Sequence, residues 1–127
     1  MKIFGHVQIK VKDLKISRKF YDEIMLILGY KVVLEIKDVV IGYGMSVHNM
    51  FKVRQFDENS PLSHSVHLAF NAPSRESVNA FHLKALKAVA ICNGKPGLRP
   101  EYEDGYYAAF VIDPDGHNIE AVYQSVH

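Results

Sequence analysis

Two histidines and one glutamate are the residues of this chain best suited to hold a reactive metal ion. His6, His67 and Glu120 each lie in a segment rich in apolar residues. Two imidazoles and one carboxylate leave two or three coordination positions open for water or a substrate. An ion held this way acts as a Lewis acid on bound oxygens. Zn, Fe(II), Mn and Ni all accept these ligands, so the sequence predicts one divalent metal ion without naming it.

The alternation of apolar and polar residues predicts which face of a sheet these side chains occupy. Successive side chains of a strand point to opposite faces. In residues 6–11 the apolar side chains share one face, and His6 and Gln8 share the other. His67 likewise falls opposite the apolar positions of its own segment. If the sheet curls, the histidine face is concave, and a carboxylate such as Glu120 is costly to bury there unless it is paired or bound to metal.

Further candidates lie in or beside the segment 93–105, which is rich in glycine, proline and charge. Arg99 could hold a substrate carboxylate through two parallel hydrogen bonds, or it could be a solvated loop charge. The hydroxyl of Tyr106 or Tyr107 could serve as an acid or base, with the two rings divided between core and cavity. We assign catalytic roles to Glu120, Tyr107 and Arg99, and substrate contacts to Gln8, Phe51, Arg99 and Tyr106.

An internal repeat predicts the elements that position these residues. At an offset of 61, His6 aligns with His67, Asp13 with Ser74, and Phe20 with Phe81. Asp13 and Ser74 are favourable N-cap residues for amphipathic helices. Apolar runs follow each helix, and we expect strands over residues 30–36, 39–43, 47–53, 89–92, 106–112 and 118–123. The predicted order is β-α-β-β-β, twice.

Composition excludes several classes of partner. The 127 residues are 48% hydrophobic, which suits a single domain with its own core. With 15 basic and 14 acidic residues, the chain has no electrostatic footprint for nucleic acid or a membrane surface. It shows no run long enough for a membrane helix and no signal-peptide pattern, so a cytoplasmic protein is expected.

Two smaller expectations concern cysteine and the remaining histidines. The single cysteine, Cys92, excludes an intrachain disulfide, fits a reducing compartment, and is expected as a small buried hydrophobe. Surface or strand-end positions are expected for His64, His82, His117 and His127.

These motifs resemble the vicinal oxygen chelate superfamily, which comprises glyoxalases, bleomycin resistance proteins and extradiol dioxygenases. The resemblance rests on His6-Val-Gln-Ile-Lys-Val-Lys-Asp-Leu with Phe20-Tyr21, on Val66-His67-Leu-Ala-Phe, and on Phe110-Val-Ile-Asp-Pro-Asp-Gly-His-Asn-Ile-Glu120. It implies an α+β fold of two βαβββ modules that form a curled half-open barrel sheet with helices on its outer face. Residues 1–59 and 64–127 would be the modules of a single domain, 1–127. The resemblance also places metal ligands at the positions of His6, His67 and Glu120.

The chain departs from the glyoxalase-like pattern at the fourth ligand, a Glu or Gln in the last strand of the first module. We expect Phe51 at that position, with Met50 and Lys52 as alternatives, and none of these suits a hard divalent ion. His48 would require an odd shift of register, which reverses the faces. A set of three ligands resembles the ring-cleaving dioxygenases instead.

Two functions are therefore expected. One is a metal-dependent enzyme acting on a small substrate with adjacent oxygens, by lyase (lactoylglutathione lyase-like), isomerase or ring-opening dioxygenase chemistry. The alternative is a protein of the bleomycin-resistance type that binds a drug or metabolite without catalysis. The modules could pair within one chain or exchange between two, so a homodimer is possible. His6 and His67 would then meet across it.

Overall fold

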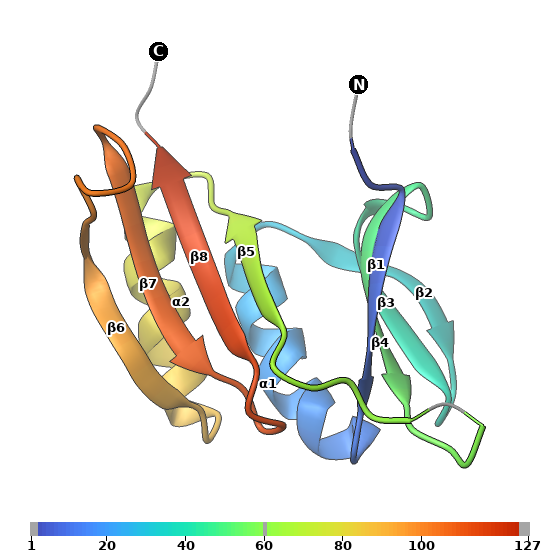
Figure 1. Ribbon diagram of the computed structural model, residues 1–127. Helices are drawn as coiled ribbons and strands as arrows, with labels where there is room; N and C mark the ends of the chain where they lie inside the picture. The colour runs from blue at the N-terminus through green and yellow to red at the C-terminus, as the bar shows by residue number, and fades with distance from the viewer. Residues whose placement is uncertain (1–2, 60, 125–127) are drawn as a thin grey trace.

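The computed structural model describes residues 3–59 and 61–124, which form two four-stranded sheets with one helix each (Figure 1). The first module contains β1 (His6–Val11), α1 (Leu14–Ile27), β2 (Lys31–Ile36), β3 (Val40–Ser46) and β4 (Asn49–Gln55). The second contains β5 (His67–Asn71), α2 (Arg75–Lys87), β6 (Ile91–Leu98), β7 (Tyr106–Ile112) and β8 (Asn118–Gln124). The predicted α+β fold of two βαβββ modules is confirmed, and the two sheets do not close into a barrel. None of the described helices is long and apolar enough to cross a membrane.

The two sheets repeat one strand order and one register. Their orders are β1-β4-β3-β2 and β5-β8-β7-β6, and in each the first strand runs parallel to the last. His6 pairs with Met50 in the first sheet, as His67 pairs with Asn118 in the second. Two residues further along, Lys52 therefore occupies the position that Glu120 occupies in the second sheet.

Both helices begin at the predicted caps. The carboxylate of Asp13 accepts hydrogen bonds from the backbone N–H groups of residues 15 and 16. Ser74 forms a reciprocal capping box with Ser77. Gly29 follows the end of α1 with φ of 92°, a left-handed conformation that glycine adopts at little cost.

One hydrophobic core lies on the helix side of both sheets. The ring of Phe51 in β4 lies 5.0 Å from that of Phe70 in β5 and 5.2 Å from that of Tyr21 in α1. Helices α1 and α2 also contact each other. Because both sheets turn their helix sides toward this shared core, their other faces, here called the open faces, point away from it (Figure 1).

A buried polar cluster joins the modules. The hydroxyl of Tyr21 in α1 donates to Oδ2 of Asp113 at 2.5 Å, and Oδ1 of Asp113 accepts from the backbone N–H groups of Asp115 and His117. His117 directly precedes β8, which is the strand-end position expected as one alternative, but it is fully buried and not at the surface. Its Nδ1 accepts from the backbone N–H of Val66, which explains why a strand-end histidine is covered.

The strand predicted over residues 89–92 is displaced. β6 runs over Ile91–Leu98, into the segment expected to be a loop, and its pairing with β7 is irregular at two places. β6 is an edge strand, where proline and glycine are tolerated because one side needs no partner. Cys92 is exposed on this edge, which corrects the prediction of a buried cysteine. His64 is exposed as expected, and His127 lies outside the described residues.

Candidate functional site

The open face of the second module holds three polar side chains in contact. The ring N–H at Nε2 of His67 (β5) donates to Oε1 of Glu120 (β8) at 2.9 Å. The hydroxyl of Tyr106 (β7) donates to Oε2 of the same carboxylate at 2.5 Å. Three neighbouring strands therefore position one cluster, and each carboxylate oxygen of Glu120 has one partner.

Burial and charge set the electrostatics of this cluster. The side chain of Glu120 is only 3% exposed, whereas that of His67 is 52% exposed. Burial and the hydrogen bond to Glu120 raise the pKa of Tyr106 well above its ordinary value. The phenol therefore stays protonated and donates, while His67 leaves the cluster accessible to solvent.

Aromatic and cationic groups surround the cluster. The Phe110 ring centre lies 6.2 Å from that of His67, and the guanidinium carbon of Arg99 lies 5.4 Å from the centre of the Phe110 ring. Nη2 of Arg99 donates to the carbonyl oxygen of Lys95 at 2.6 Å. A Cβ at Gly94 would lie 2.9 Å from the Phe110 ring, so this glycine makes room for the packing. Arg99 therefore lies over the open face, although a backbone carbonyl holds part of its head group.

Tyr107 lies on the opposite side of β7. Its hydroxyl donates to Oδ1 of Asn79 in α2 at 2.6 Å, and the guanidinium of Arg75 lies 4.9 Å from its ring centre. The expected division of the two tyrosines occurs, with Tyr106 beside Glu120 and Tyr107 against the helix. Of the two tyrosines, Tyr106 is therefore the candidate acid or base beside Glu120, and not Tyr107 as predicted.

His6 does not join His67 and Glu120 in this chain. It is exposed on β1, with the half-buried Gln8 two residues further along the same open face of the first module. Within residues 3–59 and 61–124, no three His, Cys, Asp or Glu side chains are placed to hold one ion. The structure thus brings two of the three predicted ligands together and leaves the third on the other module.

The position of the missing fourth ligand carries Lys52. Sequence reasoning favoured Phe51, but the pairing of Gln8 with Lys52 and of Ala69 with Glu120 makes Lys52 the equivalent of Glu120. The shared register of the parallel strand pairs identifies this residue, and the sequence repeat alone did not.

Phe51 lies on the helix side of β4 and lines a separate cavity between the modules. The cavity measures about 670 Å³, and its walls include Tyr30, Tyr43, Phe70 and His67. Its walls are mainly apolar, so it suits an apolar small molecule. His67 lines this cavity and also contacts Glu120, which connects the cavity to the polar cluster.

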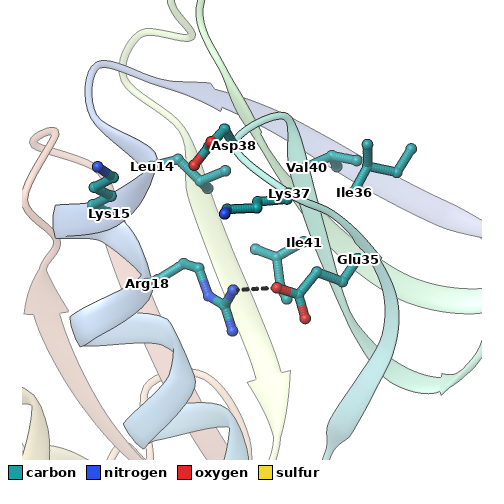
Figure 2. Close-up of a pocket in the computed structure, with 9 residues that line it drawn as sticks. All are labelled: Leu14, Lys15, Arg18, Glu35, Ile36, Lys37, Asp38, Val40 and Ile41. Carbon is teal, nitrogen blue, oxygen red and sulfur yellow. Dashed lines mark hydrogen bonds and ion pairs between the residues drawn. The ribbon is translucent and has the colours of Figure 1, made fainter.

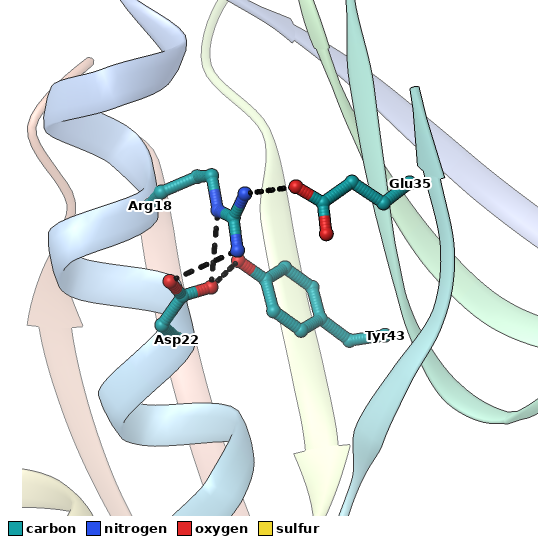
Figure 3. Close-up of polar contacts among 4 residues, drawn as sticks. All are labelled: Arg18, Asp22, Glu35 and Tyr43. Atoms are coloured by element: carbon teal, nitrogen blue, oxygen red, sulfur yellow. Dashed lines mark hydrogen bonds and ion pairs between the residues drawn. The ribbon is translucent and has the colours of Figure 1, made fainter. Parts of the chain in front are cut away.

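A second cavity, of about 490 Å³, lies between α1 and the β2–β3 turn (Figure 2). Its Arg18 is already paired, with Oε2 of Glu35 at 2.7 Å and Oδ2 of Asp22 at 3.3 Å. Tyr43 also donates to Asp22, at 2.6 Å (Figure 3), and burial raises the pKa of this tyrosine. This network attaches α1 to β2 and β3, and we interpret it as structural.

The donor set of the polar cluster fits a metal ion. Two ligands bound to one ion at about 2.1 Å and roughly at right angles lie about 3 Å apart. Nε2 of His67 and Oε1 of Glu120 have this separation. His67 and Glu120 could therefore become neighbouring ligands with little movement, once the ring proton of His67 lies on Nδ1 and leaves Nε2 free to bind.

Comparison with known proteins gives one consistent family. Residues 3–121 match the model of the Glyoxalase/Bleomycin resistance protein/Dioxygenase superfamily. A glyoxalase/bleomycin resistance protein from Albidiferax ferrireducens T118 is 31% identical with a TM-score of 0.80, and the match covers 96% of this chain and 98% of that one. No curated protein matches the chain.

More distant structures agree in fold alone. A glyoxalase-related enzyme from Fulvimarina pelagi is 21% identical with a TM-score of 0.72, and the match covers 97% of this chain and 88% of that one. A lactoylglutathione lyase from Agrobacterium tumefaciens is 16% identical with a TM-score of 0.67, and the match covers 97% of this chain and 94% of that one. With the family model spanning nearly the whole chain, the protein belongs to the glyoxalase/bleomycin resistance protein/dioxygenase superfamily.

Proposed function

We propose that this protein is a metal-dependent enzyme of the glyoxalase or dioxygenase type, acting on a small substrate with two adjacent oxygens. The observation that carries the proposal is the pair of His67 and Glu120 on one open face, with donor atoms 2.9 Å apart and Tyr106 on the second carboxylate oxygen. His67 and Glu120 would hold the ion, and His6 of a second copy would complete the three-residue set. The ion would supply Lewis-acid polarisation of the substrate oxygens.

The chain's own residues have distinct tasks in this proposal. Glu120 would accept a proton from the substrate at Oε2, and the Tyr106 hydroxyl, which lies within hydrogen-bond reach of that oxygen, would then turn to donate a hydrogen bond to a substrate oxygen. Arg99 would orient an anionic substrate group by exchanging its backbone partner for a carboxylate. Phe110 would form an apolar wall that excludes water on one side. Gln8 would line the site from the second copy together with His6.

Metal binding provides the test. Protein stripped with a chelator is dialysed against Zn²⁺, and bound metal is measured in the wild type and in His67→Ala. We expect saturable binding that falls more than about 100-fold in the variant, because even partners of metal ligands are worth 10- to 100-fold. His64→Ala changes an exposed histidine in the segment just before β5; it is the matched control and should bind normally. Equal binding by wild type and His67→Ala would end the proposal.

A second candidate function rests on the apolar cavity between the modules. Its volume of about 670 Å³ and its aromatic walls favour binding of a drug or metabolite without catalysis. Leu68→Trp would fill part of this cavity and should weaken binding of an apolar fluorescent probe. His67→Ala should retain most of the probe binding. Probe binding by chelator-treated protein, together with no metal uptake, would favour this second function.

A further inference from the structure

The cavity between α1 and the β2–β3 turn has an apolar floor and a charged rim. Leu14, Val40 and Ile41 form the floor, and all three side chains are buried. Ile36, at the end of β2, adds an apolar wall that is 52% exposed. The volume of about 490 Å³ lies in the range of small-molecule sites. A ligand that covered Ile36 would remove apolar surface from water, which favours binding.

Two neighbouring side chains of opposite charge line this cavity. Residues 37–39 join β2 to β3, and the amine of Lys37 and the carboxylate of Asp38 both point from this turn toward α1 (Figure 2). Within residues 3–59 and 61–124, neither side chain takes part in an ion pair. Asp38 has φ of 62°, a left-handed conformation that Asp and Asn tolerate better than most residues. The turn therefore offers one cation and one anion to the same space.

The other charges around the cavity are also of both signs. Oε2 of Glu35 accepts from Nη1 of Arg18 at 2.7 Å, and Oε1 of Glu35 has no partner in the described part of the chain. Arg18 also contacts Asp22, so most of its head group is already engaged. The amine of Lys15 points away from these groups (Figure 2). A ligand with only one sign of charge would therefore meet a like charge as well as an opposite one, whereas a zwitterion could satisfy both.

We propose that this cavity binds a small zwitterion with an apolar body, of the class of the aliphatic amino acids. The ligand's carboxylate accepts from the amine of Lys37, and its ammonium group donates to Asp38 and to Oε1 of Glu35. Its side chain covers Ile36. The ion pairs of Arg18 stay intact, because they hold α1 to the sheet. The cavity shares no lining residue with the polar cluster of the second module, so this binding site is separate from the proposed metal chemistry.

Titration of chelator-treated protein with L-leucine, followed by ¹⁵N NMR, tests the site. We expect saturable binding with a Kd of about 1 mM, as suits a ligand of this size with partly exposed charge contacts. The amide signals that shift should belong to residues 14–18 and 35–41.

Two matched probes each lack one charge of leucine. The compound 4-methylpentanoate has no ammonium group, and 3-methylbutylamine has no carboxylate. Each should bind at least about 5-fold more weakly than leucine, because one charged group of the cavity then lacks its partner. Equal binding of either probe, shifts gathered elsewhere in the chain, or no saturable binding of leucine would overturn the proposal.

Two conservative variants assign the contacts to the turn. Lys37→Gln and Asp38→Asn remove one charge each, and Asn tolerates the left-handed conformation, so both variants should fold as the wild type does. Each should weaken leucine binding about 5-fold. Lys37→Gln should not weaken binding of 3-methylbutylamine, which has no carboxylate for this amine. Lys31→Gln, at the other end of β2, is the matched control and should bind leucine normally. Unchanged leucine affinity in Lys37→Gln or in Asp38→Asn would contradict the inference.

Discussion

The two modules share a backbone plan but differ in what their open faces can do. Both pair the first strand with the last in one register, and both begin their helix with a side-chain cap. The first module presents His6 and Lys52, and the second presents His67 and Glu120 beside Tyr106. The helix side of a sheet must be apolar for the module to fold, whereas the open face is free to vary. The difference teaches that one backbone plan can carry a hydrogen-bonded polar cluster on the open face of one module and basic side chains on the open face of the other.

Loss of the polar junction should have the largest effect, and it tests whether the modules are one cooperative unit. Asp113→Ala leaves the Tyr21 hydroxyl and two backbone N–H groups without an acceptor in a buried place. We expect a loss of about 3 kcal/mol in the free energy of unfolding, measured with urea. Asp57→Ala, at an exposed turn, should cost less than about 0.5 kcal/mol. A second transition in the Asp113→Ala curve would show that the modules unfold separately.

The next effect separates the two faces by metal affinity. Glu120→Gln keeps the shape of the side chain but removes its charge, so Zn²⁺ binding should fall about 100-fold, equal to about 2.7 kcal/mol. Glu35→Gln, on the first module beside Arg18, should bind metal as the wild type does. Equilibrium dialysis measures both, and equal losses in the two variants would place the metal elsewhere.

A smaller effect separates the two faces of one strand. Tyr106→Phe removes a hydrogen bond to the buried Glu120 carboxylate and should cost about 2 kcal/mol of stability. Tyr107→Phe removes an exposed hydrogen bond to Asn79 and should cost under about 1 kcal/mol. Urea unfolding distinguishes the two, and a reversed order would contradict the assignment of Tyr106 to the Glu120 cluster.

The smallest effect concerns what the modules have in common. Asp13→Ala and Ser74→Ala each remove the side chain that accepts from free N–H groups at a helix start. We expect each to lower the free energy of unfolding by about 1 kcal/mol. Thermal unfolding of both variants under the same conditions measures these changes. Unequal losses of unfolding free energy would show that the two caps are not equivalent despite the matching fold.

The sequence predicted most of the frame because the frame rests on local patterns. Alternating apolar residues and the caps at Asp13 and Ser74 gave the order of the elements and the face of both histidines. The His67–Glu120 contact could also be anticipated, since both residues lie on one face. The division between Tyr106 and Tyr107 was anticipated as well, but not which of the two would contact Glu120.

The sequence could not predict features that depend on pairing between distant strands. The offset between modules is 61 at the first strand but 68 at the last, because residues 50 and 118 are equivalent. The second module is longer between these strands. The sequence repeat alone therefore favoured Phe51, and not Lys52, as the residue equivalent to Glu120. His117 was expected at the surface or at a strand end, because no local pattern reveals that this strand end is buried beside the Tyr21–Asp113 contact.

The Tyr21–Asp113 hydrogen bond has a consequence during synthesis of the chain. It joins residues 92 positions apart, so Tyr21 lacks this buried partner until the second module has been made. Contacts between such distant residues are slow to form and leave apolar surface exposed in the meantime. We therefore expect α1 to pack on the sheet of its own module first, and to form its contact with Asp113 only after the final hairpin has left the ribosome.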